Sequence, residues 1–171
     1  MNVQEELNEI QHAAFHETYD KWSLYAHLPH NSDWSLESYK LIMTIETLEQ
    51  LVSLLSYIPE NVVKTCMLFF MRNQIKPVWE DDANLSGGSF SFKVQNKQVV
   101  ETWNKMCYVI ASENMTSDEN IMSKINGITI SPKKQFCIIK IWMSDCDNKE
   151  SSIFDKLHFL EKKDAIFKKH I

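Results

Sequence analysis

The sequence predicts an α+β domain in which an antiparallel sheet is covered by helices. Segments of strand length occur in pairs, and each pair is followed by a segment whose apolar residues recur at helical spacing. Single helices between such pairs can return the chain to the same side of an antiparallel sheet. The other face of the sheet is then free to hold a ligand. With 171 residues, the chain has the size of one domain with a real core.

Seven segments have the length and composition of strands. They are residues 22–26, 39–44, 64–71, 89–94, 125–130, 136–143 and, at the end of the chain, 166–169. The clearest alternation is in residues 89–94, where Phe90, Phe92 and Val94 alternate with polar residues, as in a half-buried strand. A turn at residues 131–134 joins two of the strands.

Three segments have helical periodicity. The first covers residues 47–57, where Thr47 and Gln50 have the spacing of a capping box. The second runs from Val99 to Ile110, and the third from Ile153 to Leu160.

Residues 1–20 are expected to form an N-terminal arm, and residues 21–171 the single domain. Apolar residues at weak helical spacing favour a helical arm; they are Val3, Leu7, Ile10 and Ala14. The first fifteen residues contain glutamates but no Lys or Arg, which is the opposite of a signal peptide's basic start. No apolar stretch has the length of a membrane span. We therefore expect a cytoplasmic protein without membrane contact.

The composition argues against several functional classes. The net charge of −5 gives no global positive field of the kind that binds nucleic acid regardless of sequence. Residues 133–171 nevertheless contain nine basic and six acidic side chains, so positive charge is concentrated near the C-terminus. The four cysteines lack C-x-x-C spacing, and the three glycines cannot form the common phosphate-binding or nucleophile motifs. We expect no enzyme activity, no metal site and no cofactor.

Two tryptophans lie in polar loops, outside any periodic segment. Trp34 follows the first strand, and Trp79 stands beside Glu80 in a charged loop. One interpretation is that Trp79 only covers the edge of the core and its acidic neighbours are solvated. Alternatively, the two indoles stack on a purine, and Glu80 accepts hydrogen bonds from it. A carboxylate is acceptor-only, so it matches the N1–H and N2–H donors of guanine rather than adenine.

These residues resemble the messenger-RNA cap-binding translation initiation factor 4E family over about residues 22–150. The matching segments are Trp22-Ser23-Leu24-Tyr25, Trp34, Ile75-Lys76-Pro77-Val78-Trp79-Glu80-Asp81, Gly87-Gly88, Trp103 and residues 139–148. The resemblance implies a curved antiparallel β-sheet backed by three helices on its convex face. It also implies that the 7-methylguanosine cap is held in the concave face between Trp34 and Trp79, with capped messenger RNA as the partner.

The resemblance assigns further roles around the cap. Trp142 matches the position that touches the N7 methyl group, although a plain core indole is the alternative. Lys133 and Lys134 occupy the turn that supplies cations for the triphosphate, although a merely solvated turn is the alternative. Positions at which the family often has basic residues are occupied here by Ser89, Gln135 and Ile138. Phosphate binding is therefore expected to be weaker or rearranged.

The expected partner-binding residues lie on the first two helices. The family uses such residues to bind a scaffold or repressor helix, and their counterparts here are Leu48, Val52, Trp103, Asn104 and Lys105. Leu48 and Trp103 fit the pattern, whereas Val52, Asn104 and Lys105 depart from it.

The sequence leaves two hypotheses for the function. One is a cap-binding protein that acts in translation initiation or its regulation. The other is a decoy or regulator with impaired cap binding, which acts through its altered helical face. A cap-cleaving enzyme is disfavoured, because no nucleophile, general base or metal set converges in the sequence.

Overall fold

The computed structural model describes residues 2–5 and 15–171 of the chain. The prediction of a helical arm falls largely outside these residues, since Leu7, Ile10 and Ala14 belong to the segment that is not described. Within the described part, no helix combines the length and the apolar character that a membrane crossing requires.

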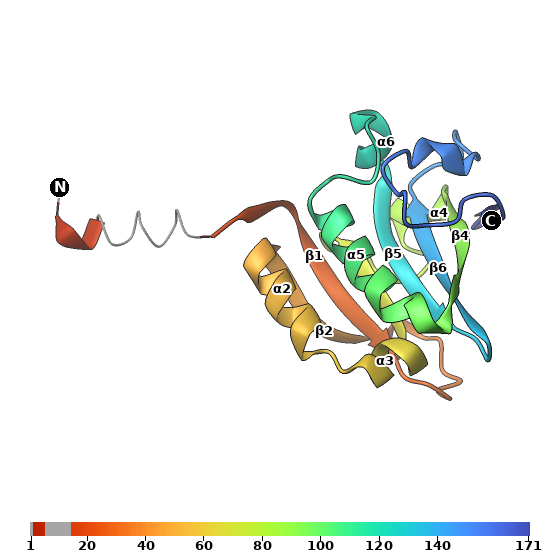
Figure 1. Cartoon of the computed structure of the whole chain (residues 1–171), viewed down its shortest axis with the longest axis horizontal. Helices are drawn as coiled ribbons and strands as arrows, with labels where there is room; N and C mark the ends of the chain where they lie inside the picture. The colour runs from red at the N-terminus through yellow and green to blue at the C-terminus, as the bar shows by residue number, and fades with distance from the viewer. Residues whose placement is uncertain (1, 6–14) are drawn as a thin grey trace.

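A seven-stranded antiparallel sheet forms the centre of the molecule, as the sequence predicts (Figure 1). Its order is β2-β1-β3-β5-β6-β4-β7. The strands are β1 (Glu17–His27), β2 (Lys40–Thr47), β3 (Met67–Arg72), β4 (Gly88–Gln95), β5 (Ile125–Pro132), β6 (Phe136–Met143) and β7 (Ile166–Lys169). The sheet is curved, and most neighbouring strands are connected by antiparallel pairing of six or more residues.

Side-chain alternation gives the sheet two different faces. On β6, Ile139 and Ile141 are fully buried in the main core, whereas Lys140 and Trp142 point to the opposite face. Strand β4 behaves in the same way, with Phe90 on the core side. The main core therefore lies on the convex side of the sheet. The concave side is called the open face below, and no layer of helices from residues 2–5 or 15–171 covers it.

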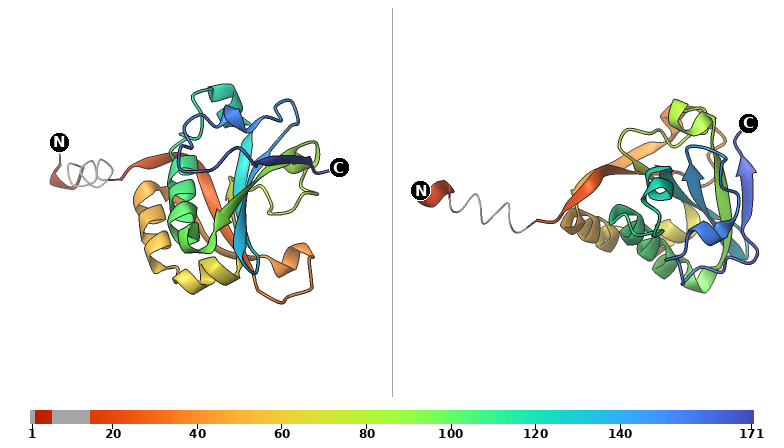
Figure 2. Two further views of the ribbon diagram at one scale, coloured as in Figure 1. Left: turned by 45° about the vertical axis from the view of Figure 1, so that its right-hand side comes forward. Right: turned by 90° about the horizontal axis from the view of Figure 1, so that it is seen from above.

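Three helices, the predicted number, cover the convex face (Figures 1 and 2). Helices α2 (Leu48–Tyr57) and α5 (Val99–Ala111) were predicted, whereas α3 (Glu60–Thr65) was not. Helix α2 begins with the predicted capping box, because the Thr47 hydroxyl accepts from the Gln50 amide and the Gln50 side chain accepts from the Thr47 amide. Helix α5 buries Trp103, Met106 and Ile110 against the sheet.

The prediction of a helix over residues 153–160 is wrong. The chain there forms only a 3₁₀ turn, η3 (Ser151–Ile153), followed by irregular turns. Its apolar residues are buried all the same, and the ring of Phe154 packs edge-on against Phe90 at 5.0 Å between ring centroids. The spacing of the apolar residues predicted their burial correctly, but these side chains reach the core from turns rather than from a helix. The third covering helix is α3.

Other boundaries also differ from the prediction. Residues 64 and 65 belong to α3, which follows Pro59 and carries an exposed Lys64–Glu60 ion pair one turn apart. Strand β1 begins at Glu17, so residues 17–20 belong to the sheet and not to an arm. The short helices α4 (Asp82–Leu85) and α6 (Glu119–Ser123) and the 3₁₀ turns η1 (Leu36–Ser38) and η2 (Asn96–Gln98) were not predicted.

The single arginine of the chain ties the ends of several elements together. Arg72, at the end of β3, forms ion pairs with Asp20 on β1 and with Glu113 after α5. Its guanidinium also donates to the carbonyl oxygens of Ile125 and Met122. The Arg72 side chain is only 9% exposed, so its charge depends on these partners.

Replacing this arginine should destabilise the fold strongly. Arg72→Met leaves two largely buried carboxylates without their counter-charge, and we expect the free energy of unfolding to fall by about 3–5 kcal/mol. Urea denaturation followed by circular dichroism measures the change. Lys21→Met is the control, because it removes a solvent-exposed pair with Glu46 that should contribute less than about 1 kcal/mol. Equal effects of the two substitutions would contradict the assigned role of Arg72.

Candidate functional site

A cavity of about 270 Å³ opens in the open face of the sheet. Its walls come from β3, β4, β5 and β6 and from the turn after β5. The lining residues are Met67, Phe69, Ser91, Thr129, Ser131, Lys133, Ile138, Lys140 and Trp142. A floor of apolar and hydroxyl side chains with two lysines suits a ligand that has both a flat ring and anionic groups.

Trp142 lies on the floor of this cavity and not in the main core. Its side chain is only 7% exposed, and its indole Nε1–H donates to the Thr129 hydroxyl at 2.8 Å. It packs in a small cluster with Phe69 and Met71 on the open face. The indole is therefore held in one orientation beneath the cavity.

Trp34 is supported by a parallel stack on His27. The ring centroids are 4.1 Å apart and the planes differ by 3°. His27 lies at the end of β1, is almost fully buried, and donates from Nε2 to the Asp33 carbonyl at 2.7 Å. Because His27 covers one face of the indole, a ligand would stack on the other face. Trp34 is 56% exposed, so that face is accessible.

Trp79 lies in a loop that is held by buried polar groups. Asn84, fully buried, donates to the carbonyl oxygens of Lys76 and Val78 at 3.2 and 2.8 Å. Asp81 accepts from the amides of Lys76 and Ala83, and it caps α4. The loop backbone is thereby fixed on both sides of Trp79, whose side chain remains 45% exposed.

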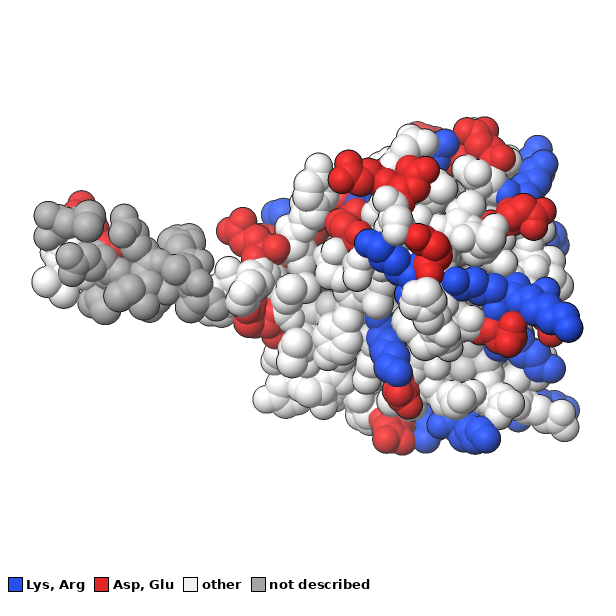
Figure 3. Space-filling view, turned by 45° about the horizontal axis from the view of Figure 1, so that its top comes forward, with Lys and Arg blue, Asp and Glu red and all other residues white. Residues whose placement is uncertain are grey.

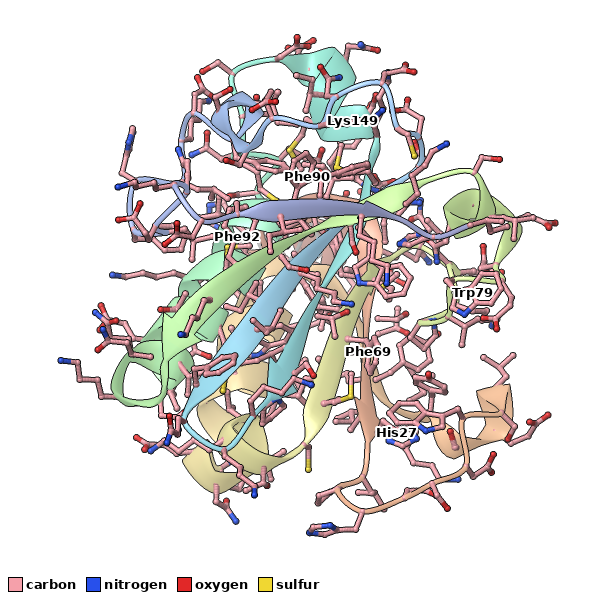
Figure 4. All side chains as sticks on the ribbon, turned by 90° about the vertical axis from the view of Figure 1, so that its right-hand side faces the viewer. His27, Phe69, Trp79, Phe90, Phe92 and Lys149 are labelled. Atoms are coloured by element: carbon pink, nitrogen blue, oxygen red, sulfur yellow. The ribbon has the colours of Figure 1, made fainter. Side chains whose placement is uncertain are left out.

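Tyr39 packs between the support of Trp34 and the floor of the open face. Its ring contacts His27 and Phe69 edge-on, at 5.2 Å between centroids in each case. Burial raises the pKa of Tyr39, and the negative charge of Glu80 raises it further. The negative charge of Glu80 therefore acts on a tyrosine that also contacts His27, the support of Trp34. Figure 4 shows Trp79, His27 and Phe69 on the same side of the open face.

The predicted basic residues are only partly at the cavity. Lys133 lines it, whereas Lys134 is exposed and is not part of the lining. Lys140, which sequence analysis missed, does line the cavity. Burial lowers the pKa of Lys140, and the positive charges of Lys133 and Lys168 lower it further. Lys168 pairs in register with Ser89, so it adds a positive charge beside the position where a basic residue was expected.

Some of these residues could have been found from the sequence. Lys140 stands two residues before Trp142 on one strand, and period-two alternation places both on the same face. Lys168 and Tyr39 carry no such signal, because their position depends on which strands pair and on contacts across the sheet.

The convex face holds the predicted partner-binding residues, but not all of them are at the surface. Val52 is 53% exposed on α2, and Leu48 is partly buried against the core. Asn104 is partly exposed, and Lys105 is exposed and paired with Glu101. Trp103 is fully buried, so it supports α5 from inside and cannot present a contact surface.

His170, directly after the C-terminal strand β7, connects the Trp79 loop to the sheet. The His170 backbone amide donates to the Gly87 carbonyl at 3.0 Å, and its Nδ1–H donates to the Asn84 carbonyl at 2.7 Å. The imidazole also packs against Trp142, with centroids 4.9 Å apart. Gly88 lets β7 approach, since a Cβ there would lie 2.5 Å from the Phe167 ring. His170 therefore links this loop to the cavity floor.

Within residues 2–5 and 15–171, no group of three or more His, Cys, Asp or Glu side chains is arranged to hold a metal ion.

Comparison with known proteins gives the family. The family model described as Eukaryotic initiation factor 4E matches residues 15–170, which is nearly the whole chain. This chain belongs to the eukaryotic initiation factor 4E family. Eukaryotic translation initiation factor 4E of Eremothecium gossypii is 32% identical over 135 residues, covering 74% of this chain and 62% of the relative. The Homo sapiens factor is 21% identical over 153 residues, covering 86% of this chain and 69% of the relative.

The chain spans somewhat less than two thirds of the length of two of the fungal 4E factors that it matches, 62% and 65%. Solved structures share its fold. A complex of C. elegans eIF4E-3 with the 4E-binding protein Mextli has a TM-score of 0.78 at 17% identity, covering 92% of this chain and 94% of the other. Schistosome eIF4E complexed with m7GpppG and 4E-BP has a TM-score of 0.71 at 20% identity, covering 79% and 75%.

The His170 contacts in this 4E family member can be tested without a ligand. His170→Ala removes the donor to the Asn84 carbonyl, so amide hydrogen exchange should accelerate in residues 76–87. His170→Asn should restore much of the protection, because its side-chain N–H can take the place of Nδ1–H. Unchanged exchange in the alanine variant would contradict this role.

The burial of His170 also predicts that the stability of the fold depends on pH. Burial lowers the pKa of His170, so the folded chain resists a proton that the unfolded chain accepts. Stability is therefore fully present above the ordinary histidine pKa of about 6.5 and is lost as the pH falls below it. As the pH falls from about 7 to 5, the unfolding free energy of the natural chain should therefore decrease relative to that of His170→Asn.

Proposed function

We propose that this protein binds the 7-methylguanosine 5′ cap of messenger RNA and acts in translation initiation or its regulation, in the cytoplasm. The observation that carries the proposal is the pair of exposed tryptophans, Trp34 and Trp79, on two loops that are both held in place at one side of the open face. Solved relatives with the same fold are complexes with m7GpppG and with m7G cap.

The two indoles are suited to a methylated purine. Methylation at N7 leaves guanine with a delocalised positive charge, and electron-rich indoles attract such a charge as a cation–π contact. In the proposed complex, the base lies between the face of Trp34 that is not covered by His27 and the ring of Trp79. Trp142 then lies beneath the methyl group.

Glu80 supplies recognition of guanine in this proposal. Its carboxylate accepts from the N1–H and N2–H of the base, and the positive charge of the methylated ring strengthens both hydrogen bonds. Adenine presents an acceptor at N1 and is disfavoured. Glu80 directly follows Trp79 in the chain, so the same loop carries the carboxylate and the stacking indole.

The phosphates are assigned to Lys133, Lys140 and Lys168, with Lys134 outside the cavity. Lysine attracts phosphate as a point charge, without the bidentate geometry of arginine. The hydroxyl groups of Ser91 and Ser131 line the same cavity and can donate to phosphate oxygens.

A protein partner on the convex face is a second part of the proposal, because solved relatives are complexes with the 4E-binding protein Mextli and with 4E-BP. The exposed charge of Lys105 and the exposed side chain of Val52 favour a partner helix of matching chemistry. Such a helix would place an acidic residue against Lys105 and an apolar residue against Val52. A regulator that acts through this face alone, with impaired cap binding, is the alternative.

Removing either indole tests the stacking arrangement. We expect Trp34→Ala and Trp79→Ala each to weaken binding of 7-methyl-GTP by about 1–3 kcal/mol, or roughly 5- to 150-fold. Isothermal titration calorimetry measures this without depending on tryptophan fluorescence. Tyr57→Ala is the matched control, because it removes an exposed aromatic ring from α2 on the convex face. Losses of less than about twofold in both tryptophan variants would argue for the alternative function.

Neutralising Glu80 tests base recognition. Glu80→Gln keeps the shape but removes the charge and one acceptor, so we expect about a tenfold loss for 7-methyl-GTP and a smaller preference over 7-methylated adenine nucleotides. Asp82→Asn, on the same loop, is the control. The assignment would be wrong if both variants bound the two nucleotides as the natural chain does.

A further inference from the structure

Four lysines lie along the open face, three on neighbouring strands and one in the turn before β6. In the sheet register, Lys168 of β7 lies beside Ser89, which pairs with Trp142. Two residues further along, Lys140 pairs with Ser91. After two more residues, Lys93 of β4 pairs with Ile138, and Lys133 stands at the turn that leads into β6. Residues paired in this way share a face of the sheet. We call Lys168, Lys140, Lys93 and Lys133 the lysine strip.

The lysine strip is not paired with carboxylates in the part of the chain that the structure describes. Within residues 15–171, none of its four ammonium groups forms an ion pair with a carboxylate, whereas Lys21, Lys64, Lys105 and Lys124 all do. Its members also act on each other, because Lys133 and Lys168 both lower the pKa of Lys140. Figure 3 shows basic side chains gathered toward the side of the molecule that carries the C-terminal strand, away from the N-terminus. In a chain with net charge −5, such a cluster fits an anionic ligand.

The strip is longer than the cavity. Lys133 and Lys140 line the cavity, but Lys93 and Lys168 do not. The loop that carries Trp79 leads into β4 at Gly88, which pairs with Met143, so the candidate base site is at the Trp142 end. Lys93 lies four residues from that end, about 13 Å along the strand at 3.3 Å per residue. It is therefore placed for a phosphate that follows the nucleotide in the cavity.

An aromatic ring accompanies the distal lysine. The ammonium group of Lys93 lies 4.5 Å from the centroid of the Phe136 ring, on the first residue of β6. Proteins that hold single-stranded nucleic acid combine a positive track for the backbone with aromatic side chains on which bases stack. Lys93 and Phe136 together provide both.

We propose that the lysine strip, ending at Lys93 and Phe136, binds the first nucleotides of the RNA chain that follows the cap. This deepens the proposed function and rests on it for the direction of the chain. Contacts are to phosphates and to one stacked base, so the strip should bind RNA without strong sequence preference. An acidic peptide would use the charges but would leave the ring of Phe136 without a stacking partner.

The test compares 7-methyl-GTP with a short capped oligouridylate over a range of about 50 to 200 mM salt. Each lysine–phosphate contact on a single strand contributes about −0.7 to the slope of log K against log salt concentration. We expect a steeper slope for the capped oligonucleotide than for 7-methyl-GTP. Lys93→Gln should make that slope shallower by about 0.7 and weaken the capped oligonucleotide about fivefold at low salt, without changing 7-methyl-GTP binding.

Two further variants sharpen the test. Lys64→Gln is the matched control, because it removes the same charge from α3 on the convex face and should leave both ligands unaffected. Phe136→Leu should weaken the capped oligonucleotide but not 7-methyl-GTP, since it removes the stacking ring and the contact of that ring with the Lys93 ammonium group, both outside the cavity.

The outcomes separate this inference from the proposed function. Equal salt slopes for the two ligands, or no effect of Lys93→Gln on the capped oligonucleotide, would overturn the inference. Binding of polyglutamate that depends on Lys93 and competes with the capped RNA on equal terms would overturn it as well. If 7-methyl-GTP were not preferred over GTP, the proposed function would fail. In that case the lysine strip is tested with an uncapped 5′-triphosphate oligouridylate. Weaker binding of this RNA to Lys93→Gln would support the inference, and unchanged binding would overturn it.

Discussion

The two-sided character of the sheet is the constraint on which the rest of the molecule depends. Period-two alternation sends Ile139 and Ile141 of β6 into the core beneath α2, α3 and α5, and it sends Lys140 and Trp142 to the opposite face. Burial of one face stabilises the fold, so the other face can carry lysines and a constrained indole whose positions are set by the same backbone. Binding groups on a sheet are held more rigidly than groups on loops alone.

The loops complete the site because each is fixed to the sheet by specific contacts. His27 belongs to β1 and supports Trp34, while Asn84 and His170 hold the segment that contains Trp79. Charge is also distributed in an ordered way. Glu80 acts near Tyr39, which touches Phe69 of β3, whereas the lysines lie on β4, β6, β7 and the turn before β6. A ligand with a positive ring at one end and phosphates at the other matches this distribution.

Much of this architecture could be predicted from the sequence. The capping box at Thr47, the alternation in β4 and the exact extent of β6 all reflect local patterns that the fold does not override. The prediction failed where burial is reached without regular structure, as at Phe154 and Leu157. At the site, the loop tryptophans and Glu80 stand out in the sequence by their setting. The supporting contacts of His27, Tyr39 and His170 do not, because they join residues that only the folded sheet brings together.

The most direct test of the account is a crystal structure of this chain with 7-methyl-GTP. We expect the methylated base between the indoles of Trp34 and Trp79, with the Glu80 carboxylate within hydrogen-bonding distance of the guanine N1 and N2 and the phosphates beside Lys140 and Lys133. A nucleotide bound elsewhere, or a base that contacts neither indole, would contradict the central claim.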